Sequence, residues 1–343
     1  MESGWACVDN VSWDVRNITL MPIITHMRNR LRYPSLTALS KDISVMRKAE
    51  TLVMAFYVVV PVIAYAFFRS WSVPLMRENF DPIWPLFWSE ALALSDDVTI
   101  SIIRSSFLIV SLLGMLLYRY RIVRLLVFVG VWQAHAFASS FGSPVHELYP
   151  WVYATLIFVF LPSFDAVRAG SERNRRLLLI IWWAQASLML LYTMAGFWKF
   201  HAAFVQLLAG EMHGFSPLAF AYQVADWVPK LQQEAPLAAF VVAHPLIAWP
   251  LYVGSHFFQL FAFWTMIRPS LQKLWAFELM LFHIGTFMVM GIEFDPFIFI
   301  VIVLLFFSPF IPEKLTLKQI FLDLPVIGQI AEYYIARRKN ATS

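Results

Sequence analysis

The sequence predicts an all-helical bundle that crosses a lipid bilayer several times. Hydrophobic residues make up 60% of the 343 residues and charged residues only 14%, a balance that ordinary soluble domains do not show. Several stretches run for about 18 residues or more with almost no charge, the length that a hydrocarbon core about 30 Å thick demands of a helix. Basic residues also alternate between one connecting segment and the next, as they do in multi-pass membrane proteins.

We expect about eight transmembrane helices, each an apolar segment bounded by charge, proline or glycine. They divide the chain into a cytoplasmic N-terminal segment 1–50, a transmembrane domain 51–312 and a cytoplasmic tail 313–343. In chain order the expected spans are 51–69, 98–117, 121–139, 148–166, 176–198, 247–267, 272–291 and 294–312.

The alternation of charge predicts the topology. Basic connections stay in the cytoplasm, so both termini are expected there, in a multi-pass cell (inner) membrane. The connections around 70–97, 146–147, 199–246 and 292–295 are poorer in basic residues and are expected to face outward. Residues on the expected cytoplasmic side include Arg47, Lys48, Arg119, Arg121, Arg173, Arg175, Arg176, Arg268, Lys273, Lys314, Lys318, Arg337 and Arg338.

The segments outside the expected spans are partly apolar. No basic region followed by an apolar run opens the chain, so a cleaved signal peptide is not expected. Residues 1–50 mix apolar and basic positions, which fits either an interfacial helix on the cytoplasmic leaflet or a loosely ordered tail. The long connection 199–246 reads as short amphipathic pieces that either lie on the membrane surface or fold back into an outer vestibule.

Several classes of function are excluded by composition. The single cysteine, Cys7, cannot form an internal disulfide or build a cysteine metal site. The net charge of +4 is accounted for by the cytoplasmic connections, so nucleic acid is not an expected partner. The histidines lack the close spacing of zinc sites, and no metal is expected.

The stretch "YTMAGFWKFH" places Lys199 directly after an apolar run. An ionisable side chain deep in a bilayer costs on the order of 3 kcal/mol or more, which makes it a candidate for function. Tyr192, Gly196 and Lys199 share one helix face, and the small Gly196 would let another helix approach beside the lysine. Apolar surroundings favour a neutral amine able to act as a base. The alternative is an interfacial lysine that reaches the headgroups, and the spacing does not decide between them.

His283 lies near the middle of an expected span and needs a hydrogen-bond partner there. The partners expected from depth are His256 and Gln259, which lie three residues apart on the preceding span. These groups are either functional or an interhelical polar clamp. His146, in the outer connection "FGSPVHELYPW", is a further candidate for acid–base chemistry on the outward side.

Two stretches resemble a known family. "YTMAGFWKFHAAFVQLLAGEMHG" is similar to a motif with a tyrosine, an Ala-Gly pair and a lysine, and "FELMLFHIGTFMVMGIEFDPFIFIVIVLLFFSPFIP" to one with a glutamate, a Phe-His pair and a span ending in Ser-Pro. Both motifs occur in the horizontally transferred transmembrane (HTTM) family, which includes the membrane region of vitamin K-dependent γ-glutamyl carboxylase. "HELYPWVYATLIFVFLP" is a weaker match, and the resemblance covers roughly residues 45–312.

The resemblance implies a role for each candidate. Lys199 would be the base that deprotonates a reduced quinone, and His146 and His283 would position substrate or stabilise an oxyanion. Tyr192, His256 and Gln259 would contact the quinone. The sequence departs from the family where Trp198 replaces the first lysine of a pair. It also has only residues 313–343 where a carboxylase has a large lumenal domain, so carboxylation of a protein is not expected.

Three functions remain open. The first is a membrane enzyme that uses Lys199 as a base on a quinone-like or other lipid-soluble substrate. The second is a non-catalytic accessory protein for the maturation, export or immunity of a small secreted peptide, a role that the resemblance also permits. The third is a transporter with a proton relay, against which the sequence offers no paired helices broken by glycine or proline.

Overall fold

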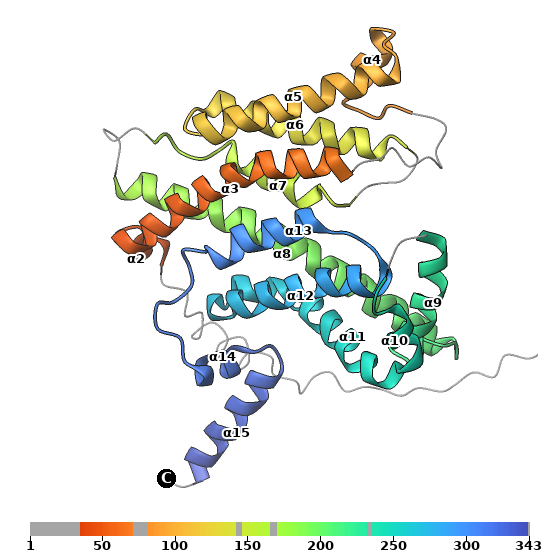
Figure 1. Ribbon diagram of the computed structural model, residues 1–343. Coiled ribbons are helices and arrows are strands. Elements are labelled where there is room, and N and C mark those ends of the chain that lie inside the picture. Colours follow the sequence, from red (N-terminus) through yellow and green to blue (C-terminus); the bar gives the residue numbers. More distant parts are fainter. Residues whose placement is uncertain (1–34, 71–80, 142–145, 165–169, 232–234, 342–343) are drawn as a thin grey trace, which may run out of the picture. The chain divides into compact units, whose positions relative to one another are not determined.

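Every regular element in the described part of the computed structural model is helical (Figure 1). The structure describes residues 35–70, 81–141, 146–164, 170–231 and 235–341. The chain divides into two units, Met1–Tyr33 and Pro34–Ser343. The first unit, which holds Cys7 and most of the segment 1–50 that we expect to be either an interfacial helix or a loosely ordered tail, lies outside the described residues. The second unit is described below.

Among the described residues, five helices are long and apolar enough to cross a membrane. Each coincides with one of the expected spans, so an all-helical architecture with helices of membrane-crossing length is confirmed. These helices are α3 (Ile43–Ser70), α5 (Asp96–Leu117), α6 (Arg121–Ser139), α8 (Ser171–Leu208) and α12 (Gln272–Met290).

The other three expected spans contain shorter helices. They are α7 (Tyr149–Phe158), α11 (Pro245–Leu260) and α13 (Asp295–Val301), the last continuing as a π-helix over Ile302–Phe306. The expected range 148–166 is helical only up to Phe158, because Pro162 disfavours helical backbone in the residue before it. In 247–267, α11 gives way to a 3₁₀ turn, Ala262–Met266. The total of eight spans stays a prediction.

Helix α8 lies at the centre of the packing. On one side it contacts α3 and α7, which pack with α5 and α6, and on the other side it contacts α11 and the 3₁₀ turn that follows (Figure 1). Helix α12 contacts both α11 and α13. The second half of α8 therefore faces α11, and residues of that half can meet residues of α11.

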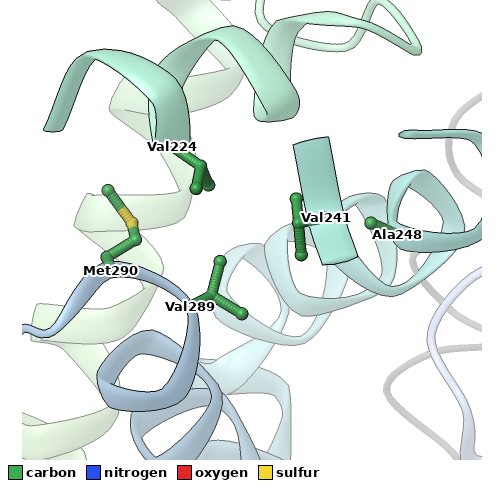
Figure 2. Close-up of a cluster of buried hydrophobic side chains, with 5 residues drawn as sticks. All are labelled: Val224, Val241, Ala248, Val289 and Met290. Atoms are coloured by element: carbon green, nitrogen blue, oxygen red, sulfur yellow. The ribbon is translucent and has the colours of Figure 1, made fainter. Parts of the chain in front are cut away.

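The long connection after Lys199 is largely helical. Helix α8 continues to Leu208, and α9 (Ala219–Leu231) and the short α10 (Ala238–Ala243) follow. Val224 of α9 and Val241 of α10 are buried with Ala248 of α11 and with Val289 and Met290 of α12 (Figure 2). The apolar face of this segment thus folds against the helices that carry the candidate site.

The C-terminal tail forms two helices, α14 (Leu317–Asp323) and α15 (Ile327–Ala341). Asp323, the last residue of α14, fixes this helix to the connection between α11 and α12. Its carboxylate accepts a hydrogen bond of 2.5 Å from the Ser270 hydroxyl and lies 3.6 Å from Arg268, and its carbonyl accepts one of 2.9 Å from Trp264 Nε1. The beginning of the expected tail is therefore part of the packed structure.

Candidate functional site

The ammonium group of Lys199 points from α8 toward α11. Its Nζ donates a hydrogen bond of 2.8 Å to Gln259 Oε1 and lies 5.3 Å from the centroid of the Phe282 ring. Gln259 is buried, whereas Lys199 is exposed by its accessible area. The two observations agree if the aliphatic stem stays open at the surface of α8 while the charged end reaches inward. The aliphatic stem is therefore the part of Lys199 that a molecule beside α8 meets first.

Gly196 makes the contact between Lys199 and Gln259 possible. A Cβ atom at Gly196 would lie 2.4 Å from the backbone nitrogen of Leu260 and 2.7 Å from its Cα, closer than real Cβ contacts allow. The prediction that a helix approaches the lysine at Gly196 is thus confirmed, and the partner is the last turn of α11. One turn earlier, Thr193 Oγ1 accepts a hydrogen bond of 2.9 Å from the backbone N–H of Phe263. These two contacts fix the end of α11 against α8.

His283 of α12 bonds to Tyr192 of α8. Its Nε2 lies 2.6 Å from the Tyr192 hydroxyl, and both side chains are buried. The expectation that His256 or Gln259 would be the partner of His283 is wrong. Depth in the bilayer leaves the rotation of each helix undetermined, and the face of α12 that carries His283 turns to α8 instead of α11.

Aromatic rings surround His283. Its ring centroid lies 5.0 Å from that of Phe282, 5.2 Å from Phe294 and 5.1 Å from Phe297. Its second ring nitrogen, Nδ1, is buried with no hydrogen-bond partner among the described residues. A buried polar atom of this kind requires an explanation, such as a water or a bound molecule that completes its bonding.

His256 lies one turn before Gln259 on α11 and is also buried. Its Nδ1 lies 2.7 Å from the carbonyl oxygen of Tyr252, so Nδ1 carries the proton and donates it. In the neutral ring Nε2 is then the acceptor. Lys199 lies within electrostatic range of both His256 and His283. The structure therefore gathers Lys199, Gln259, His256, His283 and Tyr192 around the crossing of α8, α11 and α12.

His146 belongs to a different neighbourhood. It is exposed just before α7, its ring lies 5.4 Å from that of Tyr149, and it interacts electrostatically with His135 of α6. Among the described contacts none joins His146 to Lys199 or to His283. The structure thus brings together five of the six candidate residues and leaves His146 outside the group.

Acidic side chains meet near the start of α7. Burial and the nearby carboxylates of Glu293 and Asp295 raise the pKa of Glu147 to about 7. In the part of the chain that the structure describes, no three His, Cys, Asp or Glu side chains are placed so that they could hold a metal ion.

Phe282 is the member of the site that the sequence analysis did not identify. It precedes His283 by one residue, so on α12 it points about 100° away from the histidine. That rotation places its ring under the Lys199 ammonium, where a cation–π contact stabilises a charged amine. Nothing in a run as rich in phenylalanine as "FELMLFH" distinguishes this ring from its neighbours.

Comparisons with known proteins add no assignment to this site. The chain matches no protein-family model, and no curated protein or solved structure matches it.

Proposed function

We propose that this chain is a membrane enzyme of the HTTM type, in which Lys199 acts as a base on a reduced quinone or another lipid-soluble substrate with an acidic hydroxyl group. One observation carries the proposal. Among the described residues, the polar and cation–π contacts of Lys199 are with the neutral amide of Gln259 and the neutral ring of Phe282, and neither holds a proton on the amine as strongly as a carboxylate would.

The proposed step is a proton transfer. The neutral amine of Lys199 takes the proton of the substrate hydroxyl, which leaves an ammonium group and a substrate oxyanion. Gln259 Oε1 then accepts a hydrogen bond from the new ammonium group and the Phe282 ring lies near its charge. Tyr192 and His283, bonded at 2.6 Å, form the adjacent polar pair that would orient the substrate.

The surroundings suit a substrate that arrives from the bilayer. Phe197 and Trp198, which precede Lys199 on α8, are 49% and 60% exposed, and such apolar exposure is expected at a lipid-facing surface. We place Lys199 toward the outward side of a multi-pass cell (inner) membrane, with both termini in the cytoplasm. In this arrangement the short helices α7, α11 and α13 complete a set of about eight membrane segments.

The test is a spectroscopic titration. Reduced menadione is added without oxygen to the purified protein at pH 7, and the red-shifted absorption of its anion is recorded. The wild type is expected to generate the anion, and Lys199→Gln is expected to lose the signal because its amide cannot accept the proton. Lys230→Gln is the matched control, because Lys230 is exposed on α9 and paired with Asp226 at 2.6 Å.

Equal anion signals from wild type and Lys199→Gln would contradict the proposal. The accessory function makes the opposite prediction, namely that a small secreted peptide co-purifies with the chain and that Lys199 is dispensable for this association. Mass spectrometry of the lipid extract from the purified protein shows whether a quinone is retained. This measurement reports substrate binding, whereas the absorption of the anion reports proton transfer.

A further inference from the structure

A second site is suggested by a cleft of about 520 Å³ at the turn between α5 and α6. Arg119, Tyr120 and Arg121 form this turn and line the cleft, and Arg124 lines it from the first part of α6. Ser163 and Phe164, which follow α7 in the chain, line it from the other side. Three arginines therefore share one cavity, which contains no residue of the Lys199 site.

Arg124 is buried although it is charged, with only 2% of its surface exposed. Its Nη1 donates to the carbonyl oxygens of Tyr118 and Arg119, both at 3.0 Å, and its Nη2 donates to that of Leu161 at 2.6 Å. The Leu161 carbonyl is available because the backbone has left the helix before Pro162. The side chain thus ties the α5–α6 turn to the end of α7.

These bonds satisfy donors but leave the charge of Arg124 uncompensated. All three partners are neutral, and Arg124 Nε is buried without a hydrogen-bond partner in the described part of the chain. No ion pair of Arg119, Arg121 or Arg124 occurs among the described residues. Since a buried cation is costly unless an opposite charge lies nearby, the cleft is electrostatically suited to an anion.

A second cleft, lined by residues that are expected on the cytoplasmic side, shows the contrast. It has a volume of about 450 Å³ and is lined by Arg47, Lys48 and Lys273, but also by Glu313. Glu313 lies 3.6 Å from Lys48, so this second cleft contains its own negative charge. Of these two basic clefts, the one at Arg124 has no carboxylate among its lining residues.

We propose that the cleft at Arg119, Arg121 and Arg124 binds a phosphate group, carried by a lipid headgroup or free in solution. Guanidinium groups bind phosphate oxygens through paired, charge-assisted hydrogen bonds. The lipid source is favoured by position. The cleft lies at the ends of two helices of membrane-crossing length, and the neighbouring Tyr120, Ile122 and Phe160 are about 60% exposed, where acyl chains would contact them.

The test compares two charge-matched double variants with the wild type. Arg119→Gln/Arg121→Gln removes exposed arginines that line the cleft, and Arg175→Gln/Arg176→Gln removes the same charge from exposed arginines of α8 that bind Glu172. Native mass spectrometry of the detergent-solubilised full chain is used to titrate phosphatidylglycerol, phosphatidylcholine and inorganic phosphate separately.

The wild type and the α8 variant are expected to bind phosphatidylglycerol alike, and the cleft variant about tenfold more weakly or worse, since each lost charged hydrogen bond contributes about that factor. If inorganic phosphate binds and the lipids do not, and if this binding depends on Arg119 and Arg121, the site is supported and its ligand is free phosphate. If both variants bind every probe as the wild type does, or if both lose phosphatidylglycerol equally, the proposal is wrong. This outcome is independent of Lys199, which the variants do not touch.

Discussion

The polar groups of Lys199 and His283 lie among apolar residues, and they are stabilised there in different ways. Lys199 keeps a flexible stem at the surface and places its charged end against an amide oxygen and a ring. His283 is rigid and buried, so it depends on one hydroxyl group, that of Tyr192. The first arrangement leaves the stem of Lys199 at the surface, and the second fixes an imidazole ring within electrostatic range of the amine, as the proposed proton transfer would need.

Glu147 provides a prediction on pH. In the folded state its pKa is raised to about 7 from an ordinary value of 4.5, because it is partly buried and faces Glu293 and Asp295. A folded protein with the higher pKa binds more protons than the unfolded chain between these values, so its stability falls as the pH rises from about 4.5 to about 7. Above about pH 7 the stability that protonated Glu147 contributes is lost, and below about pH 4.5 this stability is fully present.

Thermal unfolding in one detergent at pH 5 and pH 8 measures this effect. After allowance for solvent screening, the wild type is expected to lose about 1–2 kcal/mol of stability between the two pH values through Glu147. Glu147→Gln cannot ionise and should flatten this part of the profile. Glu313→Gln is the comparison, because Ser44 and Lys48 lower the pKa of Glu313. This variant should therefore lose as much stability between pH 5 and pH 8 as the wild type does. An identical pH profile for wild type and Glu147→Gln would show that Glu147 does not titrate in this range.

The crossing of α8 and α11 positions the site. Gly196 allows the last turn of α11 to touch α8, Thr193 bonds to the backbone just after it, and Gln259 consequently reaches Lys199. The contact depends on backbone atoms, which cannot move aside as a side chain can. The geometry of the Lys199 site is therefore set by the spacing of two helices.

Gly196→Ala is expected to separate α8 from α11. Its new Cβ would lie 2.4 Å from a backbone nitrogen, and overpacking of this kind costs about 1–3 kcal/mol or more. We expect a lower unfolding temperature and loss of the menadione signal. Gly254→Ala is the control, because a Cβ there meets nothing within 4 Å and alanine is the better helix former. Equal stability and signal in the two variants would contradict the role given to Gly196.

Some of this arrangement follows from the sequence and some does not. Runs without charge located the five long helices, and the helical period placed Tyr192, Gly196 and Lys199 on one face. The same reasoning gave His283 the wrong partner, since the rotation of α12 about its axis depends on packing between distant segments. Arg124 also passed unnoticed, because its buried role depends on a carbonyl freed by Pro162, 38 residues later in the chain.

The orientation of the molecule in a membrane can be tested along one helix. Helix α8 has 38 residues and is about 57 Å long at about 1.5 Å per residue, which exceeds a hydrocarbon core of about 30 Å. Arg175 lies near its first residue and Glu211 follows its last, and both are exposed. If α8 crosses the bilayer, these two residues lie on opposite sides.

Labelling of intact cells is the measurement. In a Cys7→Ser background, Glu211→Cys should react with a membrane-impermeant maleimide and Arg175→Cys should react only after the cells are permeabilised. Labelling of both positions in intact cells, or of Arg175→Cys alone, would overturn the proposed topology.

The length of α8 also has a structural consequence. Its first turns are bonded to other segments, because Arg173 donates a hydrogen bond of 3.0 Å to the Ser163 carbonyl and Asn174 donates one of 3.0 Å to the Ser40 carbonyl. About 30 Å further along the same helix, at about 1.5 Å per residue, Thr193 and Gly196 contact the end of α11. One continuous helix therefore joins both regions, and its rise sets the distance between the arginine-rich end and Lys199.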